Sequence, residues 1–269
     1  MIGARMSTLA HLRSAIGRLE AGTARQDTHG DVNRIALGHG GADAMLQGGL
    51  GRGALHEVFA PEGRHAAAAT GFIAGLAWRS ARRRPVMWVR QDFVALETGA
   101  VSMNGLAQLG LDPRLIVTVA AADIDMALRV TADALACDAL GAVVLDVWGG
   151  ARQFDLVASR KLTLAAQTSG VTCVVLRSAA MPAVSTAETR WVIRAAPSPP
   201  GSVWSVWGDP VFDAELVRNR HGQTGQWIME WKCDECLFRE PAAHSQPAAA
   251  APADRSYQAP VATLRRRAG

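Results

Sequence analysis

The sequence predicts an α/β fold in which a mostly parallel sheet is flanked by helices and extended by antiparallel strands at its C-terminal end. Short apolar runs rich in Val alternate with helical segments between residues 55 and 176, as in a parallel sheet that is buried on both faces. After residue 190 the helical segments stop while strand-like runs continue, which is typical of strands joined by turns. The chain of 269 residues, 49% of them apolar, is long enough for one sizeable core.

Residues 1–22 predict a helix that docks on another protein. Its apolar residues recur at spacings of three and four and form one stripe. The stripe consists of Leu9, Leu12, Ile16 and Leu19. The polar residues 23–34 predict a linker. Because a short striped helix precedes a linker, we expect it to dock on a partner; packing on its own domain is the alternative.

Residues 35–195 predict the core of the fold. A glycine-rich approach, with turns at its glycines, leads into the first strand. The expected strands cover residues 55–60, 86–89, 115–120, 142–147, 171–176 and 191–195. The expected helices cover residues 66–82, part of 95–110, 123–139 and 154–169. We expect Asp123 to cap the third helix and the crossovers to be right-handed.

Residues 196–240 predict the antiparallel extension. Strands are expected at 203–207, 212–219 and 226–232, and a turn at 221–225 joins the last two. Alternation in the last strand places Trp227, Met229 and Trp231 on one face, and Ile228 and Glu230 on the other.

Residues 241–269 are rich in Ala and Pro and predict a disordered tail. Its basic end, Arg265, Arg266 and Arg267, is a second candidate for partner docking. A solvated charge run is the alternative, because most terminal charges simply face water.

Charge and cysteine content narrow the classes of ligand. The net charge of +4 permits contact with nucleic acid but does not require it. Cys233 and Cys236 form a lone CxxC, whereas a structural zinc site needs four ligands, so we expect no metal and no cofactor. No run approaches the roughly 18 apolar residues of a membrane-spanning helix. We therefore expect a cytoplasmic protein that does not contact membranes.

The loop after the first core strand is the expected ligand site, because open α/β sheets bind ligands beyond the carboxyl ends of their strands. A phosphate-binding loop reads GxxxxGK[ST], where the Lys neutralises phosphates and the hydroxyl holds Mg²⁺. In this register Ala60 and His65 replace the glycines, while Ala66 replaces the Lys and Ala67 the hydroxyl residue. Only Arg64 offers a positive charge, so the sequence predicts a loop that does not hydrolyse ATP.

Two acidic residues complete this degenerate nucleotide site. Asp146 ends a run of four apolar residues, which is the pattern of a strand whose carboxylate faces Mg²⁺. Asp92 follows the preceding strand, where such enzymes keep the acid that activates water. Capping or ordering of a loop is the alternative role for Asp146. The full candidate set is Glu62, Gly63, Arg64, His65, Ala66, Ala67, Asp92 and Asp146.

Several long segments resemble known proteins. The run IALGHGGADAMLQGGLGRGALHEVFAPEG resembles the segment that leads into the core of RecA, with Pro61 and Glu62 retained and the Gly-Lys-Thr absent. Four further segments resemble the ImuA family of bacterial inducible-mutagenesis cassettes. They are HEVFAPEGRHAAAATGF, RPVMWVRQD, ALGAVVLDVW and LVRNRHGQTGQWIMEWK. Together the segments cover residues 35–232 in one order, which is far more specific than a single short motif.

The resemblance implies a RecA-like core and a function. It implies a non-enzymatic accessory protein of SOS-induced, error-prone translesion DNA synthesis that is associated with the nucleoid during DNA damage. The implied partner is an ImuB-like inactive homologue of Y-family polymerases, and through it an error-prone replicative-type polymerase. RecA and single-stranded DNA are further candidate partners. A divergent RecA-like ATPase and a SulA-like inhibitor of cell division are the alternatives.

The resemblance also implies candidate contacts with DNA. The counterparts of the two DNA-binding loops of RecA are residues 149–154 and 177–190. Arg152, Arg177 and Arg190 are the side chains in these loops that are expected to reach phosphates. Solvated loop arginines are the alternative interpretation.

Overall fold

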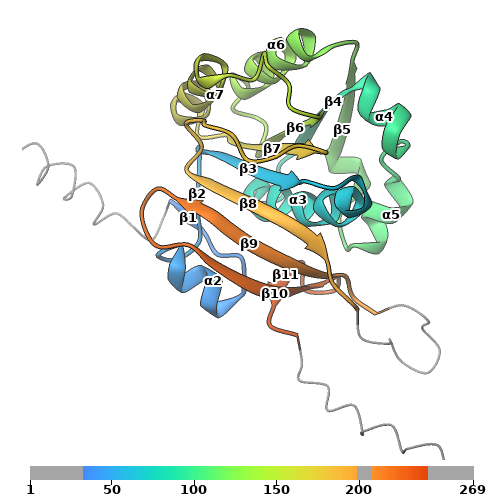
Figure 1. The fold of residues 1–269 in the computed structure, drawn as a ribbon, viewed down its shortest axis with the longest axis vertical. Helices are drawn as coiled ribbons and strands as arrows, with labels where there is room; N and C mark the ends of the chain where they lie inside the picture. The colour runs from blue at the N-terminus through green and yellow to red at the C-terminus, as the bar shows by residue number, and fades with distance from the viewer. Residues whose placement is uncertain (1–32, 199–207, 242–269) are drawn as a thin grey trace, which may run out of the picture.

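The computed structural model describes residues 33–198 and 208–241. Figure 1 shows one large twisted sheet with helices on both faces. The sheet has nine strands in the order β11-β10-β9-β8-β3-β7-β6-β4-β5. The strands are β3 (Leu55–Ala60), β4 (Val86–Gln91), β5 (Ile116–Ala121), β6 (Ala142–Trp148), β7 (Thr172–Ser178), β8 (Thr189–Ala195), β9 (Val211–Asn219), β10 (Gly225–Lys232) and β11 (Leu237–Arg239). A separate pair, β1 (Arg34–Ile35) and β2 (Leu50–Gly51), is antiparallel.

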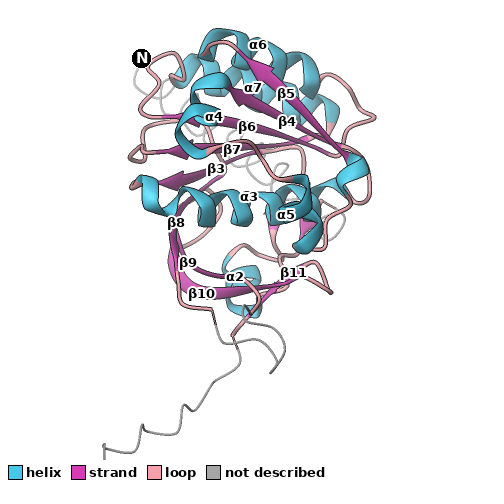
Figure 2. Ribbon diagram, turned by 90° about the vertical axis from the view of Figure 1, so that its right-hand side faces the viewer, coloured by secondary structure: helices cyan, strands magenta, loops and turns pink. Residues whose placement is uncertain are grey.

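The six strands from β8 to β5 run parallel to one another, and β9, β10 and β11 extend the sheet with antiparallel pairing. The helices are α2 (Gly40–Met45), α3 (Ala66–Ala81), α4 (Asp92–Thr98), α5 (Met103–Gln108), α6 (Ile124–Leu135) and α7 (Leu156–Ser169), with short 3-10 turns η2 (Gly63–His65) and η3 (Pro113–Leu115). Helices α2, α3 and α5 pack in one apolar cluster, and α6 and α7 pack in another on the opposite face (Figure 2). This two-sided cover explains why the central strands are apolar on both faces.

Aromatic side chains join the antiparallel strands to α3. The ring centroid of Phe72 in α3 lies 5.7 Å from that of Phe212 in β9 and 5.0 Å from that of Phe238 in β11. A Cβ at Gly75 would lie 2.8 Å from the Trp231 ring, so the helix approaches the sheet this closely only with glycine there. The indole of Trp231 donates a hydrogen bond to the carbonyl of Leu109 at 2.8 Å. The antiparallel strands therefore belong to the same core as the parallel ones.

The α/β fold class is confirmed, and the strands expected in the described residues are present. The Asp123 carboxylate accepts from the N–H of Met126 at 2.7 Å, as expected of an N-cap. Helix α6 ends at Leu135 instead of residue 139. The helical segment expected within residues 95–110 begins earlier, at Asp92, and is broken at Gly99, whose φ is +77°.

The glycine-rich approach contains structure that the sequence analysis missed. Helix α2 forms there because its N-cap His39 accepts from the N–H of Ala42 at 3.3 Å, while Asp43 accepts from Leu37 and Gly38 at 2.7 and 2.8 Å. The expected linker extends one residue too far, because Arg34 already pairs with Gly51 in β1–β2. The short strand β11 was also not expected.

Four expectations lie outside the described residues: the helix at residues 1–22, the linker at 23–32, the strand at 203–207 and the tail from residue 242. None of the described helices is long and apolar enough to cross a membrane.

Candidate functional site

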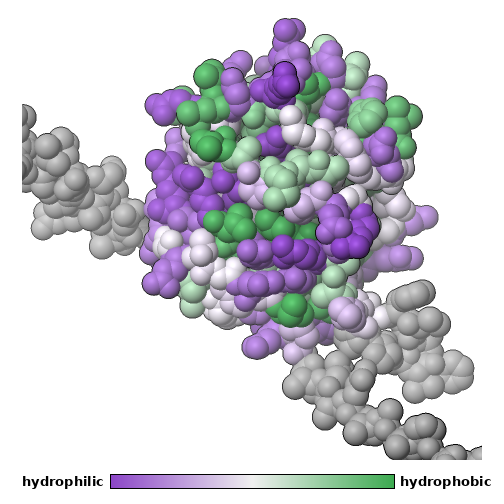
Figure 3. Space-filling view, viewed as in Figure 1, coloured by the Kyte–Doolittle hydropathy of each residue, from purple (hydrophilic) through white to green (hydrophobic). Residues whose placement is uncertain are grey.

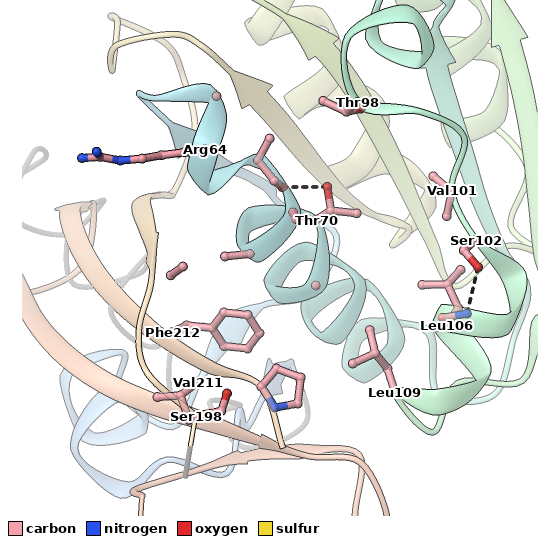
Figure 4. A pocket seen from close by; sticks show the side chains of 18 of the residues that line it. Arg64, Thr70, Thr98, Val101, Ser102, Leu106, Leu109, Ser198, Val211 and Phe212 are labelled. Carbon is pink, nitrogen blue, oxygen red and sulfur yellow. Dashed lines mark hydrogen bonds between the residues drawn. The ribbon is translucent and has the colours of Figure 1, made fainter. Parts of the chain in front are cut away.

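The loop after β3 lies where the sequence places the degenerate nucleotide site. Strand β3 lies between the parallel strands β8 and β7, and its six residues are all buried. It ends at Ala60 on the side of the sheet where the parallel strands end, which we call the carboxyl side. A cavity of about 730 Å³ opens there between the first turns of α3, the α4–α5 connection and the ends of β8 and β9 (Figure 4).

The charged residues of the loop are paired with each other or with the sheet. Arg64 Nη2 lies 2.8 Å from Glu62 Oε2, and the Arg64 side chain is 72% exposed. Figure 4 shows the Arg64 side chain extending away from α3. The backbone N–H of Ala195 donates to His65 Nδ1 at 3.1 Å, which holds the loop against the end of β8. None of these groups replaces the missing lysine, because each is directed to a protein partner or to solvent.

Helix α3 begins at Ala66, so the two positions that would contact phosphate and Mg²⁺ lie in its first turn. Ala66 and Ala67 carry only methyl groups. The nearest hydroxyl in the helix, that of Thr70, donates to the carbonyl of Ala66 at 2.9 Å. Free backbone N–H groups at a helix start attract anions, but this first turn offers no side chain for a metal.

Asp146 is buried and paired with Arg90 from the neighbouring strand. The two residues are opposite each other in the β4–β6 register, and Asp146 is 1% exposed. Its Oδ2 accepts from Arg90 Nε at 2.8 Å and from Trp88 Nε1 at 3.4 Å. Burial raises the pKa of Asp146, and the Arg90 guanidinium opposes that rise. The carboxylate expected to face Mg²⁺ therefore faces a guanidinium.

Arg90 itself is held in place by three acceptors. Besides Asp146, it donates to the carbonyl of Gly99 and, at 2.7 Å, to the hydroxyl of Thr98. These contacts tie the end of α4 to the sheet. Asp92, the other expected acid, opens α4 two residues after Arg90 and is exposed. Of the two acids expected to serve Mg²⁺ and water, Asp146 is therefore buried against a guanidinium and Asp92 is solvated.

Two of the arginines expected to contact DNA are inside the protein. Arg190 is 8% exposed, and its Nε lies 2.9 Å from Glu57 Oε2. Arg177 is 3% exposed, and its guanidinium lies 5.4 Å and 5.3 Å from the ring centroids of Phe59 and Phe154. This burial corrects the expectation for both residues, because a buried guanidinium does not reach a phosphate outside. Arg152 is exposed.

The CxxC forms the turn between β10 and β11. Burial raises the pKa of the Cys233 thiol to about 12, with Asp209 adding to the effect. Cys236 Sγ lies 3.2 Å from the carbonyl of Gly110. Such thiols stay protonated at neutral pH and are poor nucleophiles. No group of three or more His, Cys, Asp or Glu side chains that could hold a metal exists in the described part of the chain.

Arg90 and Glu57 are the site residues that the sequence analysis missed. A signal was present, because each is a charged residue inside a mostly apolar strand, VMWVRQ and LHEVFA. A charge in such a run predicts a partner on a neighbouring strand, since unpaired charges are almost never buried.

The chain is similar in sequence to one group of known proteins and similar in fold to a solved structure. No family model matches the chain. The protein called Protein ImuA from two strains of Caulobacter vibrioides is 32% identical over 199 residues, which cover 68% of this chain and 77% of that protein. Among solved structures, the RadB recombinase matches with a TM-score of 0.52 at 14% identity, over 77% of this chain and 99% of RadB. The fold is therefore RecA-like.

Proposed function

The chain belongs to the ImuA family, and from this premise we propose that it is a non-enzymatic accessory protein of SOS-induced, error-prone translesion DNA synthesis. Its partner is an ImuB-like, catalytically inactive homologue of Y-family polymerases, through which it joins an error-prone replicative-type polymerase. RecA and single-stranded DNA are further partners in this proposal. The protein acts by holding the assembly together and not by hydrolysing nucleotide.

The observation that carries the proposal is the state of the nucleotide site. Ala66 and Ala67 supply neither charge nor hydroxyl at the start of α3, and Asp146 is engaged with Arg90 at 2.8 Å. Phosphoryl transfer needs a cation at the terminal phosphates and a held Mg²⁺. This arrangement supports a RecA-like fold without the side chains that phosphoryl transfer needs, which favours a role in binding partners.

Docking in this proposal uses the two ends of the chain. The apolar stripe of Leu9, Leu12, Ile16 and Leu19 offers one helix face to a partner. Arg265, Arg266 and Arg267 offer a basic peptide at the other end.

Affinity capture tests the proposal directly. We expect the tagged full chain to capture the purified ImuB-like protein, and Leu12→Asp with Ile16→Asp to abolish capture, because two charges on the stripe cannot be buried. Ala10→Asp with Ser14→Asp adds the same two charges four residues apart on the other face of the expected helix. It is the matched control and is expected to capture normally.

ATP turnover is the second readout. We expect no Mg²⁺-dependent hydrolysis above background, with or without single-stranded DNA. Turnover that disappears in Asp146→Asn, an isosteric change, would replace the proposal with a divergent ATPase that uses Arg64, Asp92 and Asp146.

A further inference from the structure

Five arginines surround a cavity of about 410 Å³ on the opposite side of the sheet, where the parallel strands begin. We call this the amino side and the cavity the arginine pocket. Its arginines are Arg34, Arg52, Arg79, Arg82 and Arg83. Arg52 precedes β3, and Arg82 and Arg83 connect α3 to β4, so the pocket lies at the far end of α3 from the degenerate nucleotide loop.

The positive charge of the arginine pocket is largely uncompensated. Among the described residues, the single ion pair made by any of the five arginines joins Arg34 Nη1 to Glu188 Oε1 at 2.8 Å. Arg52 Nη1 donates to the carbonyl of Ser80 at 3.0 Å, while Arg52 Nε and Nη2 are buried with no acceptor in the described part of the chain. Buried donors are nearly always satisfied in native proteins, so these two point to an acceptor that comes from outside.

Capping of helix α3 accounts for only part of this cluster. Cations near a helix C-terminus offset its dipole, and Arg79 donates to the carbonyl of Ala36 at 2.7 Å and 3.0 Å. Arg82 and Arg83 are exposed and make no hydrogen bond to an acceptor among the described residues. Their φ angles of +49° and +65° lie in the left-handed region, where glycine is the favoured residue. The backbone conformation at these two positions favours glycine, yet both positions carry an arginine.

A second basic cavity lies beside helix α7, which covers the face of the sheet opposite to α3. Its volume is about 300 Å³, and it is lined by Arg160, Arg218 and Arg220. The backbone N–H of Arg220 donates at 2.9 Å to the carbonyl of Glu188, whose side chain pairs with Arg34, so Glu188 links the linings of the two cavities. Figure 3 shows hydrophilic side chains gathered at the left of the molecule, over the side where β3 and β8 begin. Two basic cavities linked in this way suit a polymer of phosphates better than a single anion.

Trp78 lines the arginine pocket and is partly exposed. Arginine contacts to phosphates beside an aromatic ring on which a base stacks are typical of sites for single-stranded nucleic acid. We propose that the arginine pocket binds a phosphodiester of single-stranded DNA, with the strand continuing toward Arg218 and Arg220. This inference rests on the proposed function and deepens it, because it assigns a place on the fold to the single-stranded DNA that the function names only as a partner.

The test exploits the left-handed backbone. Arg82→Gly with Arg83→Gly removes two charges while giving both positions the residue that their φ angles favour, so the double variant is expected to keep the melting temperature of the wild type. Fluorescence anisotropy with a labelled oligothymidylate of about 16 nucleotides measures binding to the full chain. We expect this variant to weaken binding by about tenfold or more at low salt, and to make the slope of log K against log salt shallower by about 1.4, or about 0.7 per lost phosphate contact.

The matched control is Arg114→Ala with Arg129→Ala, which removes the same charge from exposed positions outside both cavities. We expect this control to bind DNA like the wild type. Equal weakening in the two double variants would show a diffuse charge effect and overturn the proposal, as would the absence of DNA binding by the wild type. Trp78→Leu is expected to weaken binding more than Trp78→Phe, which keeps a stacking ring.

Two further measurements separate this inference from other outcomes. Titration calorimetry with inorganic tripolyphosphate tests for a small anion. The proposal of DNA is overturned if Arg82→Gly with Arg83→Gly weakens the binding of tripolyphosphate but leaves the binding of the oligonucleotide unchanged. Capture of the ImuB-like partner by the same double variant is expected to be normal. Failed capture by the wild type would overturn the proposed function and leave the DNA result standing.

Discussion

The two sides of the parallel sheet differ in whether their arginines are paired with carboxylates. On the carboxyl side, Arg64 lies 2.8 Å from Glu62, and Arg90 lies 2.8 Å from Asp146. On the amino side, Arg52, Arg82 and Arg83 make no ion pair with any described residue. Because a phosphate binds best where positive charge is not already neutralised, the side on which this fold class normally binds ligands is the less suited of the two. The two sides differ in suitability for a phosphate because of how their arginines are paired, and not because of how many arginines each side has.

Asp146→Ala is expected to have the largest effect on the stability of the protein, through the charge pair on the carboxyl side. It leaves Arg90, whose side chain is 12% exposed, without its carboxylate. We expect the free energy of unfolding to fall by about 3 kcal/mol, because losing one partner of a buried pair leaves the other uncompensated. Urea denaturation measures the change, with the exposed Asp92→Ala as control at no more than about 0.5 kcal/mol. A similarly small loss for both variants would mean that Asp146 has no structural role.

The left-handed residues of the amino side give the next largest effect. Arg82→Gly with Arg83→Gly is expected to leave the free energy of unfolding unchanged or to raise it by up to about 1 kcal/mol, because relief of left-handed strain outweighs the entropy of two glycines. Arg79→Gly, three residues earlier in helix α3, is expected to lower the free energy by about 1 kcal/mol. Thermal or urea unfolding of both variants checks the opposite signs. A clear loss of stability in the double variant would mean that these arginines are structural.

The pH dependence of stability tests whether burial raises the pKa of Asp146. Its pKa in the folded protein is raised by burial, so the folded state holds the proton more tightly than the unfolded chain does. The associated stability is fully present below the unfolded pKa of about 3.9 and is lost as pH rises through the folded pKa. Relative to the non-titrating Asp146→Asn, the wild type should therefore lose stability as pH rises from about 4. A difference that stays constant with pH would show that the environment of Asp146 does not perturb its ionisation.

The smallest effect is expected at the surface pair of the degenerate loop. Glu62→Ala should change the free energy of unfolding by no more than about 0.5 kcal/mol, because exposed ion pairs contribute little. The side chains of Glu62 and Arg64 are 56% and 72% exposed. A change above about 1 kcal/mol would mean that the loop supports the fold.

The fold was predictable from local patterns. Apolar runs at β3, β4, β6 and β7 and the capped helix after Asp123 carry their own signals, because burial on two faces and helix capping leave marks in short stretches of sequence. Helix α2 was missed because its stabilising contacts come from His39 and Asp43 within a glycine-rich stretch. Part of the site was predictable too, since Ala66 and Ala67 are read directly at the start of α3.

The sequence by itself determined the α/β class, the order of the elements, the resemblance to the ImuA family and the absence of the phosphate-binding side chains. Only the tertiary structure decided that Asp146 pairs with Arg90, that Arg177 and Arg190 are buried, and that five arginines gather on the amino side. The reason is physical. A residue type and its spacing are local, whereas the partner and the exposure of a charge depend on the register of strands that are far apart in the chain; Arg90 and Asp146 are separated by 56 residues.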